Sequence, residues 1–147
     1  MQQIFVELYN YGPAWGKCSE NERTDFVKKV IEAVNGLKSA GVDVIAYGKN
    51  SHETDRRAPY DFFCVYRVPS AEFQREFERQ ITTSGWYNYF EQVNISGPVE
   101  DFAAVLLGNA KMVRPGGAPP TRSSDAHSRG RACTAGDVRP STTDREG

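Results

Sequence analysis

The chain has few of the residues that most often build metal centres and disulfide frameworks. Its 147 residues include three cysteines and two histidines. Cys18, Cys64 and Cys133 lie far apart and form no CxxC pair, so we expect reduced thiols in a cytoplasmic protein. His52 has no second histidine or cysteine at ligand spacing, which argues against a zinc or haem site. We therefore predict that the protein holds no metal and no cofactor.

Long apolar runs and an excess of one charge are also missing. No apolar run approaches the ~18 residues that cross a membrane, and we expect no signal peptide because the first residues lack a basic segment. The net charge is −1 at pH 7, which gives neither nucleic acid nor an anionic membrane an electrostatic reason to bind. The motifs GxGxxG, HExxH and GxSxG are absent, which removes the common nucleotide, zinc-protease and hydrolase functions.

What the sequence does contain is an ordered series of strand and helix patterns. Apolar residues at a period of two predict four strands. These strands cover residues 3–11, 42–48, 62–68 and 91–95.

Two helix patterns separate these strands. The first has Ser19 as a helix cap with Glu22 three residues later, and it stops at Gly41. The second is capped by Ser70 and stops at Gly85. Both patterns carry an apolar stripe at helical spacing, so each helix should bury one side against the sheet.

A short apolar helix around residues 102–106 follows the last strand, giving the order β-α-β-β-α-β plus one helix. This order predicts an α+β domain over residues 1–113, with a ferredoxin-like antiparallel sheet and both long helices on one face. Residues 114–147 are rich in glycine, proline, serine, threonine and arginine. Such a segment cannot bury enough apolar surface to offset its ordering entropy, so we predict a disordered tail.

The other face of the sheet is expected to be bare. We expect it to present Phe5, Glu7 and Tyr9, which would make it too aromatic to stay exposed on a stable monomer. Two such faces packed together would form a barrel, and a symmetric homodimer is the simplest way to arrange them.

Two segments also resemble a known group of proteins. Residues Val6 to Asn10 with Pro13-Ala14-Trp15, and the aromatic segment from Gly85 to Asn94, resemble an uncharacterised bacterial family of dimeric α+β barrels. The broader superfamily includes antibiotic-biosynthesis monooxygenase-like, EthD-like and muconolactone-isomerase-like proteins. The resemblance covers residues 2–113.

The resemblance implies a homodimer with a mostly apolar cavity that binds a hydrophobic, aromatic or polyketide-like small molecule. The implied chemistry is proton transfer, cyclisation, isomerisation or oxygenation without a cofactor. Some members of the superfamily use haem or a metal, and others have no activity, so fold alone does not give function. The alternative is a non-catalytic dimeric interaction module with no ligand cavity.

Two residues are the candidates for proton transfer. If Glu7 lines a cavity, loss of solvent would raise its pKa and make it a general acid or base. Otherwise it is a half-exposed strand glutamate, paired for example with Arg67. His52, in the loop between the second and third strands, becomes a second proton donor if that loop folds over the cavity mouth. Otherwise it is a solvated loop histidine.

The candidate substrate-binding residues share an aromatic ring or a polar group near the expected cavity. They are Tyr9, Asn10, Trp15, Tyr47, Tyr66, Arg67, Trp86 and Asn94. The tyrosines lie within strands, where a buried hydroxyl needs a partner, and the asparagines can bond a ligand carbonyl. The tryptophans either line an aromatic pocket or fill one end of the core. Asp55-Arg56-Arg57 is either an anion clamp or a solvated loop.

Overall fold

Strand β1 (Gln3–Tyr11) lies inside a four-stranded antiparallel sheet. It pairs on one side with β3 (Phe62–Val68) and on the other with β4 (Phe90–Pro98), while β2 (Asp43–Lys49) extends the sheet beyond β3. The resulting order, β2-β3-β1-β4, confirms the predicted α+β fold with an antiparallel sheet. The computed structural model describes residues 1–113, so the predicted tail at 114–147 lies outside the described residues.

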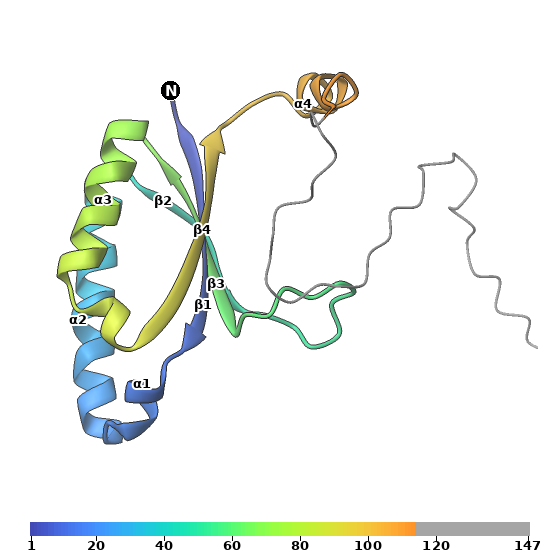
Figure 1. The fold of residues 1–147 in the computed structure, drawn as a ribbon. Coiled ribbons are helices and arrows are strands. Elements are labelled where there is room, and N and C mark those ends of the chain that lie inside the picture. Colours follow the sequence, from blue (N-terminus) through green and yellow to red (C-terminus); the bar gives the residue numbers. More distant parts are fainter. Residues whose placement is uncertain (114–147) are drawn as a thin grey trace, which may run out of the picture. The chain divides into compact units, whose positions relative to one another are not determined.

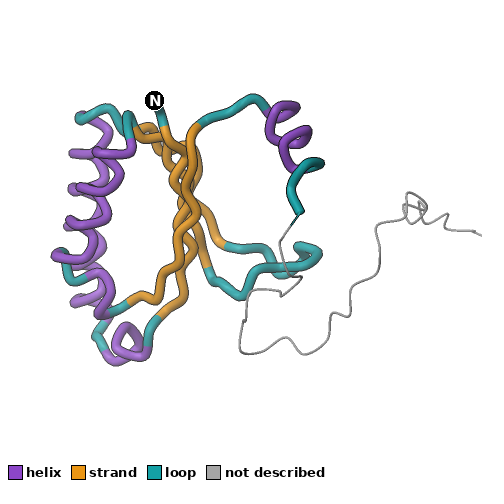
Figure 2. The backbone as a smooth tube through the Cα atoms, turned by 45° about the horizontal axis from the view of Figure 1, so that its top comes forward, coloured by secondary structure: helices purple, strands orange, loops and turns teal. Residues whose placement is uncertain are grey.

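The two long helices lie on the same side of the sheet (Figures 1 and 2). Helix α2 spans Glu20–Ser39 and helix α3 spans Ala71–Thr83. The predicted caps are present. The Ser19 hydroxyl accepts a hydrogen bond from the Glu22 amide while the Glu22 carboxylate accepts one from the Ser19 amide at 2.7 Å. At the start of α3, the Ser70 hydroxyl accepts a hydrogen bond from the Phe73 amide at 3.1 Å. These bonds satisfy amide groups that have no partner inside a helix.

Two short helical elements add to the predicted order. They are α1 (Pro13–Lys17) and the 3-10 helix η1 (Trp86–Asn88). Gly85, at φ +84°, starts η1, and Gly41, at φ +97°, follows the end of α2. A residue with a side chain is strained at such angles, so both predicted stops depend on glycine.

The core lies between the sheet and the helices. Phe5 is fully buried, packs edge-on against Phe77 of α3 with ring centres 5.8 Å apart, and stacks on Tyr66 at 6.2 Å. Burial alternates along β1 and β3, so one side chain in two enters this layer. The buried apolar residues are Phe5, Tyr9, Val42, Phe62, Cys64, Tyr66, Val68, Phe77 and Phe90.

The expected assignment of the two sheet faces is wrong. Phe5, Glu7 and Tyr9 belong to the buried side, beneath the helices, and not to the bare face. Both sides of β1 are apolar, so alternation alone cannot say which one the helices cover. The large aromatic rings fill the thicker layer between sheet and helices, where more area is removed from water.

The face opposite the helices, called here the open face, is built from smaller apolar side chains. Their alternation and register assign to it Ile4, Val6, Leu8, Phe63, Val65, Val93 and Ile95. None of them is fully buried, and Ile95 is 62% exposed. The open face is therefore an apolar surface within the described residues.

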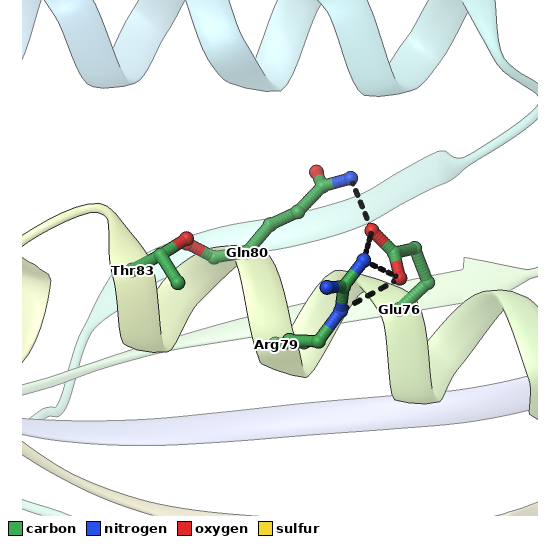
Figure 3. A network of polar contacts seen from close by, with 4 residues as sticks. All are labelled: Glu76, Arg79, Gln80 and Thr83. Carbon is green, nitrogen blue, oxygen red and sulfur yellow. Dashed lines mark hydrogen bonds and ion pairs between the residues drawn. The ribbon is translucent and has the colours of Figure 1, made fainter.

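Helix α3 has a polar outer surface (Figure 3). Glu76 and Arg79 form an exposed ion pair at 2.6 Å, and the Gln80 amide donates to Glu76 at 3.1 Å. Phe77, on the same helix, is 7% exposed and faces the core. This division explains why α3 lies flat on the sheet with one side in water.

The predicted C-terminal helix is α4 (Phe102–Asn109). It is apolar, yet no residue in it is buried, and Phe102 and Leu107 are 75% and 69% exposed. Among the described residues, no helix combines the length and hydropathy that crossing a membrane requires.

Candidate functional site

Glu7 sits at the middle of β1, opposite Cys64 of β3 and Asn94 of β4. The alternation of β1 directs its side chain beneath the helices, where it is 2% exposed. It is the only buried acidic side chain among the described residues. A carboxyl group in such a place needs hydrogen-bond partners or a proton to offset the loss of water.

Both oxygen atoms of Glu7 accept a hydrogen bond. The Tyr9 hydroxyl donates to Oε2. The Gln92 amide nitrogen donates to Oε1 at 2.8 Å and also to Asn94 Oδ1 at 2.8 Å. Two strands of the sheet therefore hold the carboxyl group in one orientation.

The environment brings the Glu7 carboxyl close to neutral titration. Burial raises its pKa from 4.5 to about 7, because the charged form loses solvation. The hydrogen bonds from Tyr9 and Gln92 act in the opposite direction, and the charge of Glu78 adds a small increase. A group with this pKa is populated in both forms near pH 7, which is the property of an efficient general acid or base.

The neighbouring hydroxyl and thiol groups stay protonated. Burial, followed by the charge of Glu7, raises the pKa of Tyr9 and of Tyr66 well above the ordinary value. Burial also raises the pKa of the Cys64 thiol to about 12. The tyrosines therefore serve as hydrogen-bond donors, and Cys64 is a buried core residue and not a nucleophile.

A cavity of about 140 Å³ opens beside Glu7, between the sheet and helices α2 and α3. Its walls are mainly apolar and aromatic. They include Tyr9, Val30, Val34, Leu37, Tyr47, Tyr66, Phe77, Ile81 and Trp86, and the polar wall residues are Glu7, Gln80, Ser84 and Gln92. The Gln80 amide donates to Glu76 of the same helix (Figure 3). Among the residues that line the cavity, Glu7 is the charged one.

Two buried polar atoms at this cavity have no hydrogen-bond partner among the described residues. They are Trp86 Nε1 and Gln92 Oε1. Such atoms are rare in folded proteins because each costs about 1–3 kcal/mol. This donor and this acceptor could each form a hydrogen bond with a polar group of a bound ligand.

A larger groove of about 830 Å³ lies between α2 and the edge strand β2. It shares four wall residues with the Glu7 cavity, which are Val30, Val34, Tyr47 and Trp86. Its volume falls within the roughly 300–1,000 Å³ of small-molecule sites, whereas the Glu7 cavity alone is smaller.

The structure brings five of the predicted site residues together. Glu7, Tyr9, Tyr47, Tyr66 and Trp86 all line the cavity beside Glu7. Trp15 lines the neighbouring groove instead.

The other predicted residues lie elsewhere. The Asn10 amide donates to the Pro59 carbonyl at 3.0 Å. Arg67 forms an ion pair at 2.9 Å with Asp43, so it is not the partner of Glu7. Asn94 is exposed and reaches the site only through its bond with Gln92.

The loop between β2 and β3 does not cover the site. His52 is exposed there and lines neither the cavity nor the groove. The Arg57 guanidinium donates to backbone carbonyls of its own loop, including Ser51 at 3.0 Å and Tyr60 at 2.9 Å. It therefore holds the loop in shape and is not free to clamp an anion, while Arg56 is exposed and lies 3.8 Å from Asp55. The described residues contain no group of three or more side chains arranged to hold a metal ion.

Sequence reasoning missed Gln92. Once Phe90 is placed in the core, period-two alternation puts Gln92 on the same side of β4, so a buried amide was predictable in principle. Its contact with Glu7 was not, because this hydrogen bond joins residues 85 positions apart and depends on the pairing of β1 with β4.

Comparison with known proteins identifies one matching family. No curated protein matches the chain. Residues 2–112 match a family of unknown function, DUF6616, and this span takes in the whole sheet, both long helices and every residue beside the Glu7 cavity. The chain therefore belongs to the DUF6616 family of unknown function.

Proposed function

We propose that this protein binds a hydrophobic small molecule beneath its helices and uses Glu7 to move a proton on it. The observation that carries the proposal is a buried carboxyl group, with a pKa of about 7, at the wall of an apolar cavity. Structural carboxylates are usually paired with a cation, whereas Glu7 is bonded only to neutral groups.

The proposed chemistry needs no cofactor. The Glu7 carboxylate takes a proton from an acidic C–H or O–H of the ligand and returns it at a second position, which gives isomerisation. Before the proton returns, the deprotonated ligand can instead attack an electrophilic carbon of its own, which gives cyclisation, or react with dissolved O₂ as the oxidant, which gives oxygenation. Tyr9 holds the carboxylate, and the Tyr66 hydroxyl stabilises the oxygen on which negative charge develops. His52 has no part in this scheme because it lies outside the cavity.

A probe ketone tests the proton transfer directly. We expect the protein to accelerate hydrogen–deuterium exchange at the C1 position of 2-tetralone, an aromatic ketone, as followed by NMR in D₂O. Positioned acid–base groups contribute about 100-fold or more, and Glu7→Gln should remove this contribution. Glu91→Gln, an exposed carboxylate on β4, is the matched control and should keep it. Exchange that is equally fast in wild type and Glu7→Gln contradicts the role of Glu7.

We also propose that the open face pairs with a second copy of the chain. Its exposed apolar residues, with Ile95 62% and Val93 43% exposed, support this pairing. The apolar helix α4, which has no buried residue, adds to the exposed apolar surface. Since the Glu7 cavity lies on the opposite side of the sheet, pairing through the open face leaves the cavity available.

The rival function is a non-catalytic interaction module, as some barrel proteins are expected to be. The exposed open face favours it, but an interaction module gives no role to the cavity or to the raised pKa of Glu7.

A cytoplasmic location is also a proposal, supported by the free thiols of Cys18 and Cys64.

A further inference from the structure

We propose that the groove between α2 and β2 binds an elongated hydrophobic carboxylate, with the carboxylate at Lys49 and the apolar part beneath α2. The binding site stands on the geometry of the groove alone. The identification of its ligand as the substrate of Glu7 rests on the proposed function.

Helix α2 does not pack as a core helix. None of its residues is buried, and Val27 and Ile31, which belong to its apolar stripe, are 40% and 53% exposed. Both line the groove, together with Val30 and Val34. Phe26 and Leu37 of α2 pack against the core, but the apolar residues between them face an open volume of about 830 Å³. An apolar guest would remove this surface from water.

The opposite wall of the groove is aromatic. Tyr47 from β2, Phe62 from β3, Phe90 from β4 and Trp86 from η1 all line it. Trp86 stacks on Phe90 with ring centres 4.1 Å apart, so these rings form a continuous surface. Flat and flexible apolar chains both pack well on such a surface.

The charges at the groove have one sign. Its charged lining residues are Lys38 and Lys49, and no aspartate or glutamate lines it. Neither lysine forms an ion pair within the described part of the chain. A ligand with one negative group is therefore complementary to the groove, and a cationic ligand is not.

Lys49 is the better anchor of the two. Lys38 lies in the last turn of α2, where it already interacts favourably with the negative end of the helix dipole. Lys49 pairs with Phe62 at the end of the edge strand, so alternation directs it to the covered side together with Tyr47. Asp61, which precedes Phe62 along the chain, accepts a hydrogen bond from the Tyr11 amide at 3.1 Å.

The groove leads toward Glu7. Val30, Val34, Tyr47 and Trp86 separate the groove from the Glu7 cavity and belong to both. A ligand anchored at Lys49 would thus extend along α2 until its far end meets the wall of that cavity. This placement assigns the substrate class as a hydrophobic acid whose reactive end is remote from its carboxylate.

The two tryptophans of the chain give a direct readout, because Trp15 and Trp86 both line the groove. Intrinsic fluorescence is titrated with decanoate and with 1-decanol, each below its aggregation limit. We expect both to bind saturably, with decanoate bound about fivefold more tightly. Lys49→Gln should remove this difference and leave decanol binding unchanged.

Lys29→Gln is the matched control, since Lys29 is exposed on α2 and lines neither site. If Lys29→Gln and Lys49→Gln weaken decanoate binding equally, the attraction is a general charge effect and Lys49 is not the anchor. If neither compound binds saturably, the groove is not the proposed binding site. Two measurements on the wild type keep the two proposals distinguishable. Saturable decanoate binding without accelerated 2-tetralone exchange supports the groove and contradicts the role of Glu7, whereas accelerated exchange without decanoate binding contradicts the groove alone.

Discussion

The two faces of the sheet are both apolar but are treated differently by the fold. The covered face carries Phe5, Glu7 and Tyr9, all at most 2% exposed, and a layer of aromatic rings joins it to α3. The open face carries aliphatic side chains of the same strands, and Ile95 on it is 62% exposed. The one buried acid among the described residues is on the covered face, where loss of water changes its titration most. The proposed chemistry and the proposed association therefore lie on opposite sides of one sheet.

The largest expected effect is the loss of an aromatic ring from the covered face. Phe5→Ala removes a fully buried ring that contacts Phe77 and Tyr66, so we expect it to lower the free energy of unfolding by about 3–5 kcal/mol. Val6→Ala, the next residue along β1 and on the open face, should cost about 1 kcal/mol. Urea denaturation of the two variants measures this contrast. Equal losses would contradict the assignment of the two faces.

The next effect is the pH dependence that Glu7 gives to stability. Its pKa is 4.5 in the unfolded chain and about 7 in the fold, so the folded state holds more protons between these values. The free energy of unfolding should then fall as pH rises from 4.5 to 7, by on the order of 3 kcal/mol, and level off above 7.

Glu7→Gln isolates this contribution. The variant side chain can still accept the Tyr9 hydrogen bond, and a flipped Gln92 would turn its unpartnered Oε1 toward the new amide. We expect the variant to be as stable as wild type near pH 4.5 and more stable at pH 8. Parallel stability curves for the two proteins over this pH range would show that Glu7 titrates normally.

A charge on the open face should break self-association. Ile95→Lys alters a 62% exposed residue, so we expect the fold to be kept and the dimer to dissociate at concentrations about 30-fold higher than for wild type. Light scattering after gel filtration measures the mass, and circular dichroism checks the fold. Thr82→Lys, on the exposed side of α3, is the control. A wild-type protein that is monomeric at 100 μM or so would sink the proposed pairing.

The smallest effect belongs to the outer surface of α3. Arg79→Ala removes an exposed ion pair with Glu76, which should cost at most ~0.5 kcal/mol. Phe77→Ala on the inner side of the same helix should cost about 3–5 kcal/mol. Thermal unfolding of both variants gives the comparison, and a larger loss from Arg79 than from Phe77 would mean that α3 does not pack through its apolar side.

Most of the fold was predictable because its signals are local. The limits of β1 and β3 and the caps at Ser19 and Ser70 follow from alternation and from side chains within a few residues. The short helix η1 was missed because the aromatic segment after Gly85 has no periodicity to distinguish a turn from the start of a strand.

The site was only partly predictable, because it depends on pairing between distant segments. Glu7, Tyr9 and Tyr66 were identified from residue type and strand position, but Glu7 and Tyr9 were expected on the wrong face of the sheet. The proposed partnership with His52 required a loop to fold over the cavity, and the loop instead keeps its own backbone contacts through Arg57. No local pattern reports such long-range packing.

Whether Glu7 is a buried acid–base group beneath the helices can be measured by titrating its carboxyl group. The protein would be labelled with ¹³C at glutamate side-chain carboxyls, and NMR spectra recorded from pH 3 to 9 or so, with Glu7→Gln to assign the signal. We predict a midpoint of about 7 for Glu7. A midpoint near 4.5 would show a solvated carboxylate and contradict the proposed function.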